Sequence, residues 1–398
     1  MPPVHSRPAD LNILTGACLA SSTTSGIALV ALALRLSQTG SGWAVAGLWL
    51  AGTVPAVVLA PITGLLLDRV ETVRLLRHLA LAGAVLDTGL AAVPGVAWVL
   101  VLASLLGLVS ATSAPGLLAI AGPLRAAPGD EARSLTRLQA AQWAGATVGP
   151  VLGAVVVVAW GTRAPLLVDA VFLVLLAVGL GALRTKRTPA PRLAGESWRT
   201  TLGAGLRLLG ADPLLRRLIL PVALVVAFVN VAVVVEVFLA TRVFNAGPLG
   251  YGALVSLWGA GLVVGTLAVP RMSHLHPLRL TGMGAALAAL GLAGAGLSPG
   301  LGPALLAYGL GGLGNGLEMN SARVLVQRQA PAEIHGRAFA AYFAVGSGSA
   351  AIGAVLGGVL LAGVGSRGAM EVAALPVAGA AIWLIWISRR SHTGRVVP

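Results

Sequence analysis

Long apolar stretches separated by short polar gaps run along almost the whole chain. A helix needs about 20 mainly apolar residues to cross a bilayer. Twelve stretches meet that criterion, approximately residues 11–34, 43–67, 75–93, 96–121, 139–160, 165–183, 218–240, 250–269, 280–297, 301–320, 338–362 and 369–388. We find no run of alternating polarity of the kind that membrane barrels require. The pattern predicts an all-α membrane protein with twelve transmembrane helices.

Composition supports lipid as the solvent of this chain. Of 398 residues, 57% are hydrophobic and 10% are charged, against about a quarter charged in ordinary soluble domains. Too few polar residues remain to cover a water-soluble core of this size. The single cysteine, Cys18, excludes a disulfide framework and a cysteine-based metal site.

The net charge of +14 follows from the distribution of arginines between the apolar stretches. If the amino terminus lies inside, all but four of the 27 basic residues fall in gaps on the inner side. The exceptions are Arg35, Arg163, Arg242 and Arg367. The positive-inside rule then predicts a multi-pass protein of the inner (plasma) membrane with both termini cytoplasmic. The charge needs no nucleic-acid partner, because it does not gather on a soluble face with stacking aromatics.

The longest polar interval, residues 184–217, divides the twelve stretches six and six. It contains Pro189, Pro191 and the only lysine, Lys186. We therefore expect an amino-terminal bundle over 1–183, a cytoplasmic linker over 184–217 and a carboxyl-terminal bundle over 218–398. Apolar residues at helical spacing between Trp198 and Leu209 predict an interfacial helix in the linker. The alternative is a solvated linker.

The two halves resemble each other. Residues of the first half recur 204 positions later: Arg133, Gly149 and Gly153 correspond to Arg337, Gly353 and Gly357. Two related six-helix bundles around a site at the bilayer midplane are a common construction of secondary transporters.

The segment between the second and third stretches carries Gly64, followed by Asp68 and Arg69. This motif resembles the loop signature of the major facilitator superfamily, although the basic continuation is incomplete and the second half lacks the aspartate. The resemblance implies that Asp68 contacts the inner end of the fourth span, where Arg125 is the candidate partner, and that this contact locks the outward-facing state. An aspartate there also complements the amino end of a neighbouring helix.

The fifth stretch is similar to a signature associated with drug:proton antiporters. It carries Gly145, Gly149, Pro150 and Gly153, while Thr136 replaces an upstream glycine. Small residues at this spacing let helices touch closely, and proline permits a kink. A gating hinge and simple helix packing are both compatible with this pattern.

Three further segments, Gly26 to Arg35, Pro55 to Arg69 and Leu166 to Phe172, resemble macrolide and siderophore exporters of the same superfamily. The similarity extends over nearly the whole chain in span order and loop length. It is specific for transport and unspecific for a given cargo.

Four carboxylates fall inside apolar stretches, where a charge is expensive: Asp87, Asp169, Glu236 and Glu318. Such an environment favours the neutral acid, which suits proton loading and release. The resemblance places Glu236 and Glu318 in cavity-lining spans. We expect Glu236, with nearby Asn230, to be the first proton or substrate site.

Each carboxylate also has a structural interpretation. Glu236 pairs with Arg242 in that alternative, Glu318 pairs with Arg323, Asp169 caps a helix or pairs with Arg163, and Asp87 packs in a peripheral span. The polar patch Ser21 to Ser25 either touches cargo or hydrogen-bonds its own helix.

An embedded enzyme finds no support. All six histidines lie in loops or at span ends, and no metal-binding histidine pair, nucleophile elbow or nucleotide-binding loop is present. We expect no cofactor and no metal.

The sequence predicts a monomeric secondary transporter that exports a moderately hydrophobic small molecule by proton antiport. The alternatives are a proton-coupled metabolite uptake symporter and a non-transporting membrane sensor.

Overall fold

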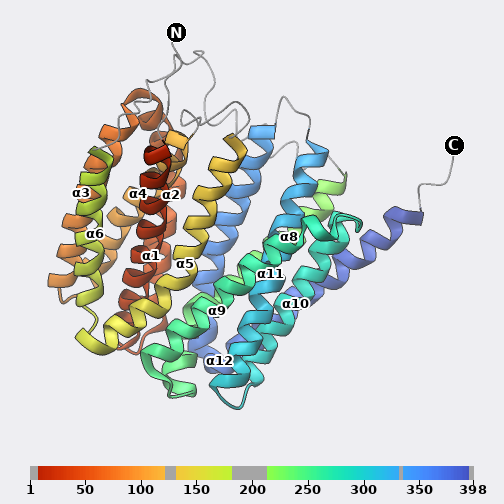
Figure 1. Cartoon of the computed structure of the whole chain (residues 1–398). Helices are drawn as coiled ribbons and strands as arrows, with labels where there is room; N and C mark the ends of the chain where they lie inside the picture. The colour runs from red at the N-terminus through yellow and green to blue at the C-terminus, as the bar shows by residue number, and fades with distance from the viewer. Residues whose placement is uncertain (1–7, 122–130, 182–212, 331–334, 394–398) are drawn as a thin grey trace, which may run out of the picture. The chain divides into compact units, whose positions relative to one another are not determined.

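The computed structural model describes residues 8–121, 131–181, 213–330 and 335–393, and within these ranges every regular element is a helix. The first half contains α1 (Pro8–Ser37), α2 (Gly42–Arg69), α3 (Thr72–Ala92), α4 (Val96–Ala121), α5 (Glu131–Trp160) and α6 (Ala164–Gly181). The second half contains α8 (Pro213–Phe238), the π-helical turn η1 (Leu239–Val243), α9 (Gly247–Ala268), the 3₁₀ turn η2 (Pro270–Met272), α10 (Pro277–Leu297), α11 (Leu301–Gln329) and α12 (His335–Thr393). Figure 1 shows their course. The prediction of an all-helical chain is confirmed for the described residues.

Each expected apolar stretch falls largely within a helix, and the last two share α12. That helix leaves helical geometry at Gly365, whose φ of 70° and ψ of −179° lie in a region that glycine tolerates. Gly365 thus separates the expected stretches 338–362 and 369–388. Short connections with a proline join α3 to α4 and α10 to α11: α3 ends at Ala92, before Pro94, and α10 ends at Leu297, before Pro299.

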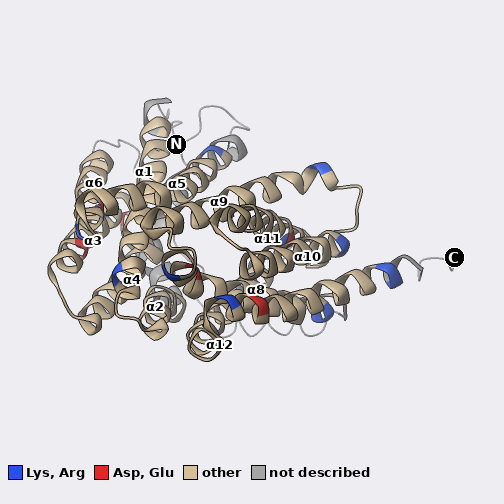
Figure 2. Cartoon of the chain, turned by 90° about the horizontal axis from the view of Figure 1, so that it is seen from below, with Lys and Arg blue, Asp and Glu red and all other residues tan. Residues whose placement is uncertain are grey.

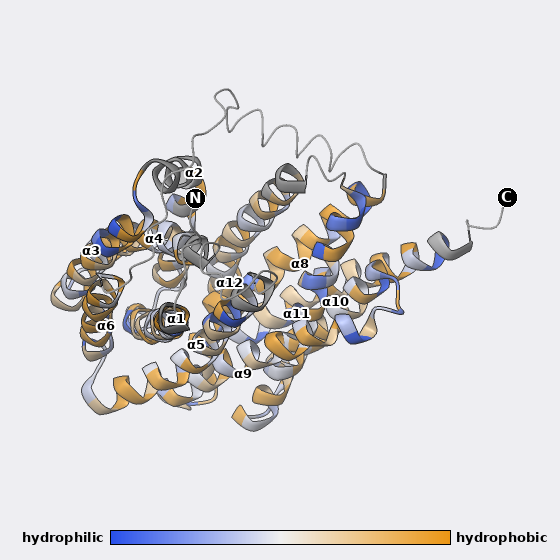
Figure 3. Cartoon of the chain, turned by 45° about the horizontal axis from the view of Figure 1, so that its top comes forward, coloured by the Kyte–Doolittle hydropathy of each residue, from blue (hydrophilic) through white to orange (hydrophobic). Residues whose placement is uncertain are grey.

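Nine stretches of the described residues are long and apolar enough to cross a membrane, so the chain is a multi-pass membrane protein. One of them, Ala341–Arg390, spans 50 residues and includes the Gly365 break. The glycine-rich α11, with Asn315, Glu318 and Asn320, is not among them. Figure 2 shows few charged residues along the helices, and Figure 3 shows hydrophobic colour over most of their length. Twelve crossings stay a prediction.

The chain divides into two compact units. Described residues up to 39 and from 47 to 181 belong to the first, and residues 40–46 and those from 213 onward belong to the second. The expected linker lies almost entirely outside the described residues, as does its expected interfacial helix.

The same packing recurs inside each unit. In the first, α1 packs on α5, and α3 packs on α4 and α6. In the second, α8 packs on α12, and α10 packs on α11 and α12. These pairs match under the 204-residue offset, so the internal repeat of the sequence is also a repeat of helix contacts.

Candidate functional site

All four carboxylates singled out in the sequence are buried in the structure. The exposed fractions are 0% for Asp87, 3% for Asp169, 7% for Glu236 and 1% for Glu318. A charged group is rarely buried so fully unless it is paired. The surroundings of each group therefore decide what it can do.

Glu236 lies in the last turn of α8, immediately before the π-helical turn η1. Its carboxyl group is within electrostatic reach of Tyr251 in α9 and Tyr308 in α11, both fully buried. The Tyr308 ring meets Trp258 edge to face at 5.7 Å between centroids. Glu236 is thus buried inside the second unit, close enough to two phenol groups for its charge to affect them.

Asn230 precedes Glu236 on the same helix. Its side-chain amide donates to the Val226 carbonyl at 2.8 Å. Its Cβ also lies 2.8 Å from the position that a Cβ on Gly353 of α12 would occupy. Asn230 therefore sits at the α8–α12 contact, and its substrate role stays a prediction.

Glu318 is buried in α11, and neither of its carboxyl oxygens has a hydrogen-bond partner among the described residues. Arg323, one turn later, attracts Glu318 electrostatically. Its guanidinium nevertheless lies over the Phe343 ring, 5.2 Å from the centroid. The neighbouring Asn320 donates to Thr266 Oγ1 at 2.8 Å, which ties α11 to α9.

Asp87 and Asp169 form a contact that the sequence did not reveal. They belong to α3 and α6, and their carboxyl groups interact with each other. Thr24 of α1 contacts Asp169 as well. The three residues lie far apart along the chain, so only the packing of α1, α3 and α6 unites them.

The small residues of α5 bring its backbone against α1. A Cβ on Gly145 would meet the Leu19 carbonyl oxygen at 2.6 Å, and one on Gly153 would meet the Ile27 Cα at 2.8 Å. Pro150 Cδ lies 3.1 Å from the position of a Cβ on Gly26. Helix packing is therefore an actual role of this motif, and its role as a gate stays a prediction.

The expected contact between Asp68 and Arg125 falls outside what can be described. Gly64, Asp68 and Arg69 lie in the last turns of α2, but their side chains are outside the described part of the structure, and Arg125 is outside the described residues.

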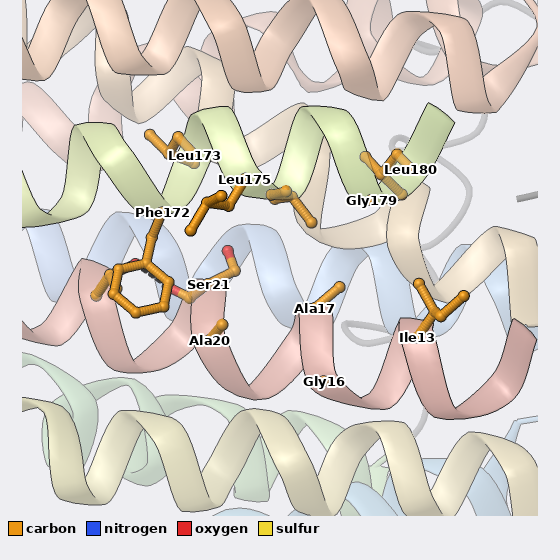
Figure 4. A pocket seen from close by; sticks show the side chains of 12 residues that line it. Ile13, Gly16, Ala17, Ala20, Ser21, Phe172, Leu173, Leu175, Gly179 and Leu180 are labelled. Atoms are coloured by element: carbon orange, nitrogen blue, oxygen red, sulfur yellow. Dashed lines mark hydrogen bonds between the residues drawn. The ribbon is translucent and has the colours of Figure 1, made fainter. Parts of the chain in front are cut away.

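A cavity of about 220 Å³ lies between α1 and α6. Figure 4 shows its lining, with Gly16, Ala17, Ala20 and Ser21 on one side and residues of α6, from Phe172 to Leu180, on the other. The lining is largely apolar, and Ser21 and Thr24 supply its hydroxyl groups.

No group of three or more histidine, cysteine, aspartate or glutamate side chains suited to a metal ion occurs in the described ranges.

Comparisons with known proteins agree with this architecture. The family model described as Major Facilitator Superfamily matches residues 11–347. No curated protein matches the sequence.

Solved structures of transporters share the fold at low sequence identity. The nucleoside transporter NupG is 15% identical, with a TM-score of 0.75 over 97% of this chain and 100% of its own. A bacterial homolog of the human lysosomal transporter Spinster, in an inward-facing and unoccupied conformation, is 13% identical, with a TM-score of 0.77 over 98% and 100%. The peptide transporter POT in complex with sulfate is 15% identical, with a TM-score of 0.76 over 96% and 95%. Because the family model covers most of the sequence, this chain belongs to the Major Facilitator Superfamily, a family of transporters.

Proposed function

We propose that the protein is a proton-coupled antiporter that exports a moderately hydrophobic small molecule by alternating access. The proposal includes twelve crossings in two related bundles. It also places both termini on the cytoplasmic side of an inner (plasma) membrane and has the protein act as a monomer. Family membership supports transport, and the resemblance of the α5 segment to drug:proton antiporters supports export. The asymmetry of basic residues supports the orientation.

The buried Glu236 carries the coupling part of the proposal. A carboxyl group buried within electrostatic range of Tyr251 and Tyr308 is stable when neutral and costly when ionised. Contact with water on one side of the membrane would release its proton, and return to the buried state would require a new proton or a cationic cargo. A group with this property links proton movement to a conformational change.

Gating would use the elements that the sequence singled out. Asp68 with Arg125 would stabilise one state, and the close contact of α5 with α1, around Gly149 and Pro150, would act as a seal or hinge. Alternation requires two states that the cargo and the proton bind with different affinity.

The test uses the full chain reconstituted into lipid vesicles with an imposed pH gradient and a panel of lipophilic dyes and antibiotics. We expect accumulation against the cargo gradient in the wild type and loss of the gradient-driven component in Glu236→Gln. The matched control is Glu371→Gln, the same substitution at an exposed glutamate of α12. Gradient-driven export by Glu236→Gln at the wild-type rate would remove Glu236 from the coupling role.

Uptake by proton symport is the second candidate. The solved structures with the same fold include proteins named as nucleoside and peptide transporters. The same vesicles separate the two functions by direction: cargo that moves with the proton flux indicates symport, and cargo that moves against it indicates antiport.

A further inference from the structure

The carboxyl groups of Asp87 and Asp169 meet inside the first unit, with no cation among the described residues placed to balance them. Both oxygens of Asp87 and Oδ1 of Asp169 are buried and have no hydrogen-bond partner in that part of the chain. Two carboxylates held together in a dry environment cannot both be ionised, because each disfavours the charge of the other and burial disfavours both. At least one proton must therefore remain on the pair.

The arginines of the surrounding helices interact with other groups and do not neutralise the two carboxyl groups. Arg35 of α1 donates its guanidinium protons to the carbonyls of Leu90 and Val93 at the end of α3. The positive charge of Arg163, the residue before α6, repels that of Arg35. Arg137 of α5 donates to Asn12 at 3.0 Å.

The remaining neighbours add no cation close to the pair. Arg74, Arg77 and His78 lie in the first two turns of α3, and Arg77 is ten residues, about 15 Å of helix, from Asp87. The helix α4, which also packs on α3, contains no charged residue.

Thr24 of α1 is the polar neighbour of the pair. Its hydroxyl donates to the Ser21 carbonyl at 3.3 Å, and a hydroxyl has only one hydrogen to give. Its oxygen still contacts the Asp169 carboxyl group. Because the hydroxyl can rotate, Thr24 can instead donate this hydrogen to the Asp169 carboxyl group, which links the pair to α1.

The cavity between α1 and α6 reaches the carboxyl pair through Thr24. Thr24 lines this cavity together with Ser21, and Thr24 is also the residue that contacts Asp169. A volume of about 220 Å³ exceeds the share of one water molecule, about 30 Å³, several times over. The hydroxyl of Ser21, labelled in Figure 4, and that of Thr24 are polar partners for such water.

We propose that Asp87 and Asp169 form one proton-binding site, in which a single proton is shared between the two carboxyl groups at neutral pH and exchanges through Thr24 and the α1–α6 cavity. The pair titrates as a unit, so its two protonation steps belong to neither residue alone. The first unit then has a proton site of its own, separate from Glu236 in the second.

Infrared spectroscopy of the purified full chain in lipid nanodiscs tests the proposal, because a protonated carboxyl group has a C=O band separate from those of a carboxylate. Cargo is absent, so the outcome does not depend on whether transport occurs or in which direction. Labelling with ¹³C-aspartate shifts the aspartate band away from any contribution of Glu236 and Glu318. We expect a shifted band at neutral pH in the wild type.

Single substitutions then test whether the two carboxyl groups share the proton. In Asp87→Asn or Asp169→Asn, the new amide donates a hydrogen bond to the remaining carboxylate and replaces the proton, so the aspartate band disappears from both variants. Thr24→Val retains the band but shifts its frequency and slows its exchange with deuterium. Glu371→Gln, at an exposed position, leaves it unchanged.

Two results overturn the proposal. If ¹³C-aspartate labelling of the wild type shifts no carboxyl C=O band at neutral pH, the pair carries no proton. A band that survives in one asparagine variant and vanishes only in the other shows that the proton resides on a single aspartate. If either variant fails to fold, absence of the shifted band from the labelled wild type by itself still overturns the proposal.

Discussion

Gly149 of α5 lies so close to Thr23 of α1 that a Cβ on the glycine would come within 2.5 Å of the Thr23 carbonyl oxygen. The same contact recurs 204 residues later, where a Cβ on Gly353 of α12 would collide with the carbonyl oxygen of Ala227 in α8. Each helix pair thus meets backbone to backbone, at a separation that only glycine permits. The duplicated sequence has kept the same contact in both units.

Substitution of one of these glycines should destabilise its unit. Gly353→Ala forces α8 and α12 apart, and overpacking of this kind costs about 1–3 kcal/mol. Thermal unfolding of the purified protein in detergent measures the effect. Gly346→Ala, in the same helix but with open space around its added methyl group, is the control. It should leave the Tm unchanged or raise it, because alanine is favoured over glycine by up to about 1 kcal/mol within a helix. Equal Tm values for the two variants would contradict the packing argument.

Two of the four arginines on the predicted outer side stabilise the ends of equivalent helices. Arg367 donates from Nη1 to the carbonyls of Gly296 and Ser298 at 2.8 and 2.7 Å, at the end of α10. Arg35 does the same for α3, through Leu90 and Val93. Cations at helix carboxyl ends satisfy free carbonyls and complement the helix dipole.

Loss of such a cap should lower stability more than loss of an exposed arginine. Arg367→Met removes two hydrogen bonds from a charged donor, each worth about 1.5–3 kcal/mol. Arg328→Met at the exposed end of α11 should stay within about 0.5 kcal/mol of the wild type. Chemical unfolding followed by tryptophan fluorescence compares the two. An Arg367→Met protein as stable as Arg328→Met would show that the cap contributes nothing.

Tyr308→Phe should be neutral or stabilising. The Tyr308 hydroxyl is buried without a hydrogen-bond partner among the described residues, and an unsatisfied buried polar group costs about 1–3 kcal/mol. Phenylalanine keeps the ring contact with Trp258. A fall in Tm relative to the wild type would mean that the hydroxyl has a partner, with Glu236 the first to be tested by the double variant.

The two buried glutamates of the second unit should differ in function. Glu236 lies beside two tyrosines, whereas Glu318 lies one turn from the positive charge of Arg323. We expect Glu318→Gln to retain gradient-driven transport at a reduced rate, while Glu236→Gln loses the dependence on the pH gradient. Flux measured across a series of imposed gradients provides the comparison. Reversal of the two phenotypes would transfer the coupling role to Glu318.

Reporter fusions at the two ends of the chain test the predicted topology. The positive-inside rule expects both reporters to be active in the cytoplasm. Opposite locations of the ends would require an odd number of crossings and would exclude two six-helix bundles.

The sequence was sufficient for the helices because hydrophobic length is a local property. Lipid requires every backbone polar group to be bonded within its own segment, so an apolar run of sufficient length forms a helix. The hairpins at Pro94 and Pro299 were predictable for the same reason, since proline ends a helix locally. The break at Gly365 lies in the gap between two predicted stretches, and helical geometry resumes on its far side.

Contacts of the buried carboxyl groups, in contrast, join residues far apart in the chain and could not be predicted from local sequence. The sequence identified Asp87, Asp169, Glu236 and Glu318 one by one, from the expense of a charge in an apolar stretch. For three of them it offered, as the structural alternative, a partner nearby in the chain, such as Arg163 for Asp169 and Arg323 for Glu318. In the structure, Asp169 instead meets Asp87 of another helix.

By itself, the sequence determined that this protein is helical, lies in a membrane and carries an internal duplication, because each of these follows from the order of apolar, basic and small residues along the chain. Only the tertiary structure decided which helix faces lie together. It joined Thr24, Asp87 and Asp169 into one cluster and placed Glu236 among tyrosines, since such contacts depend on the rotation of each helix about its axis and on the partner it packs against.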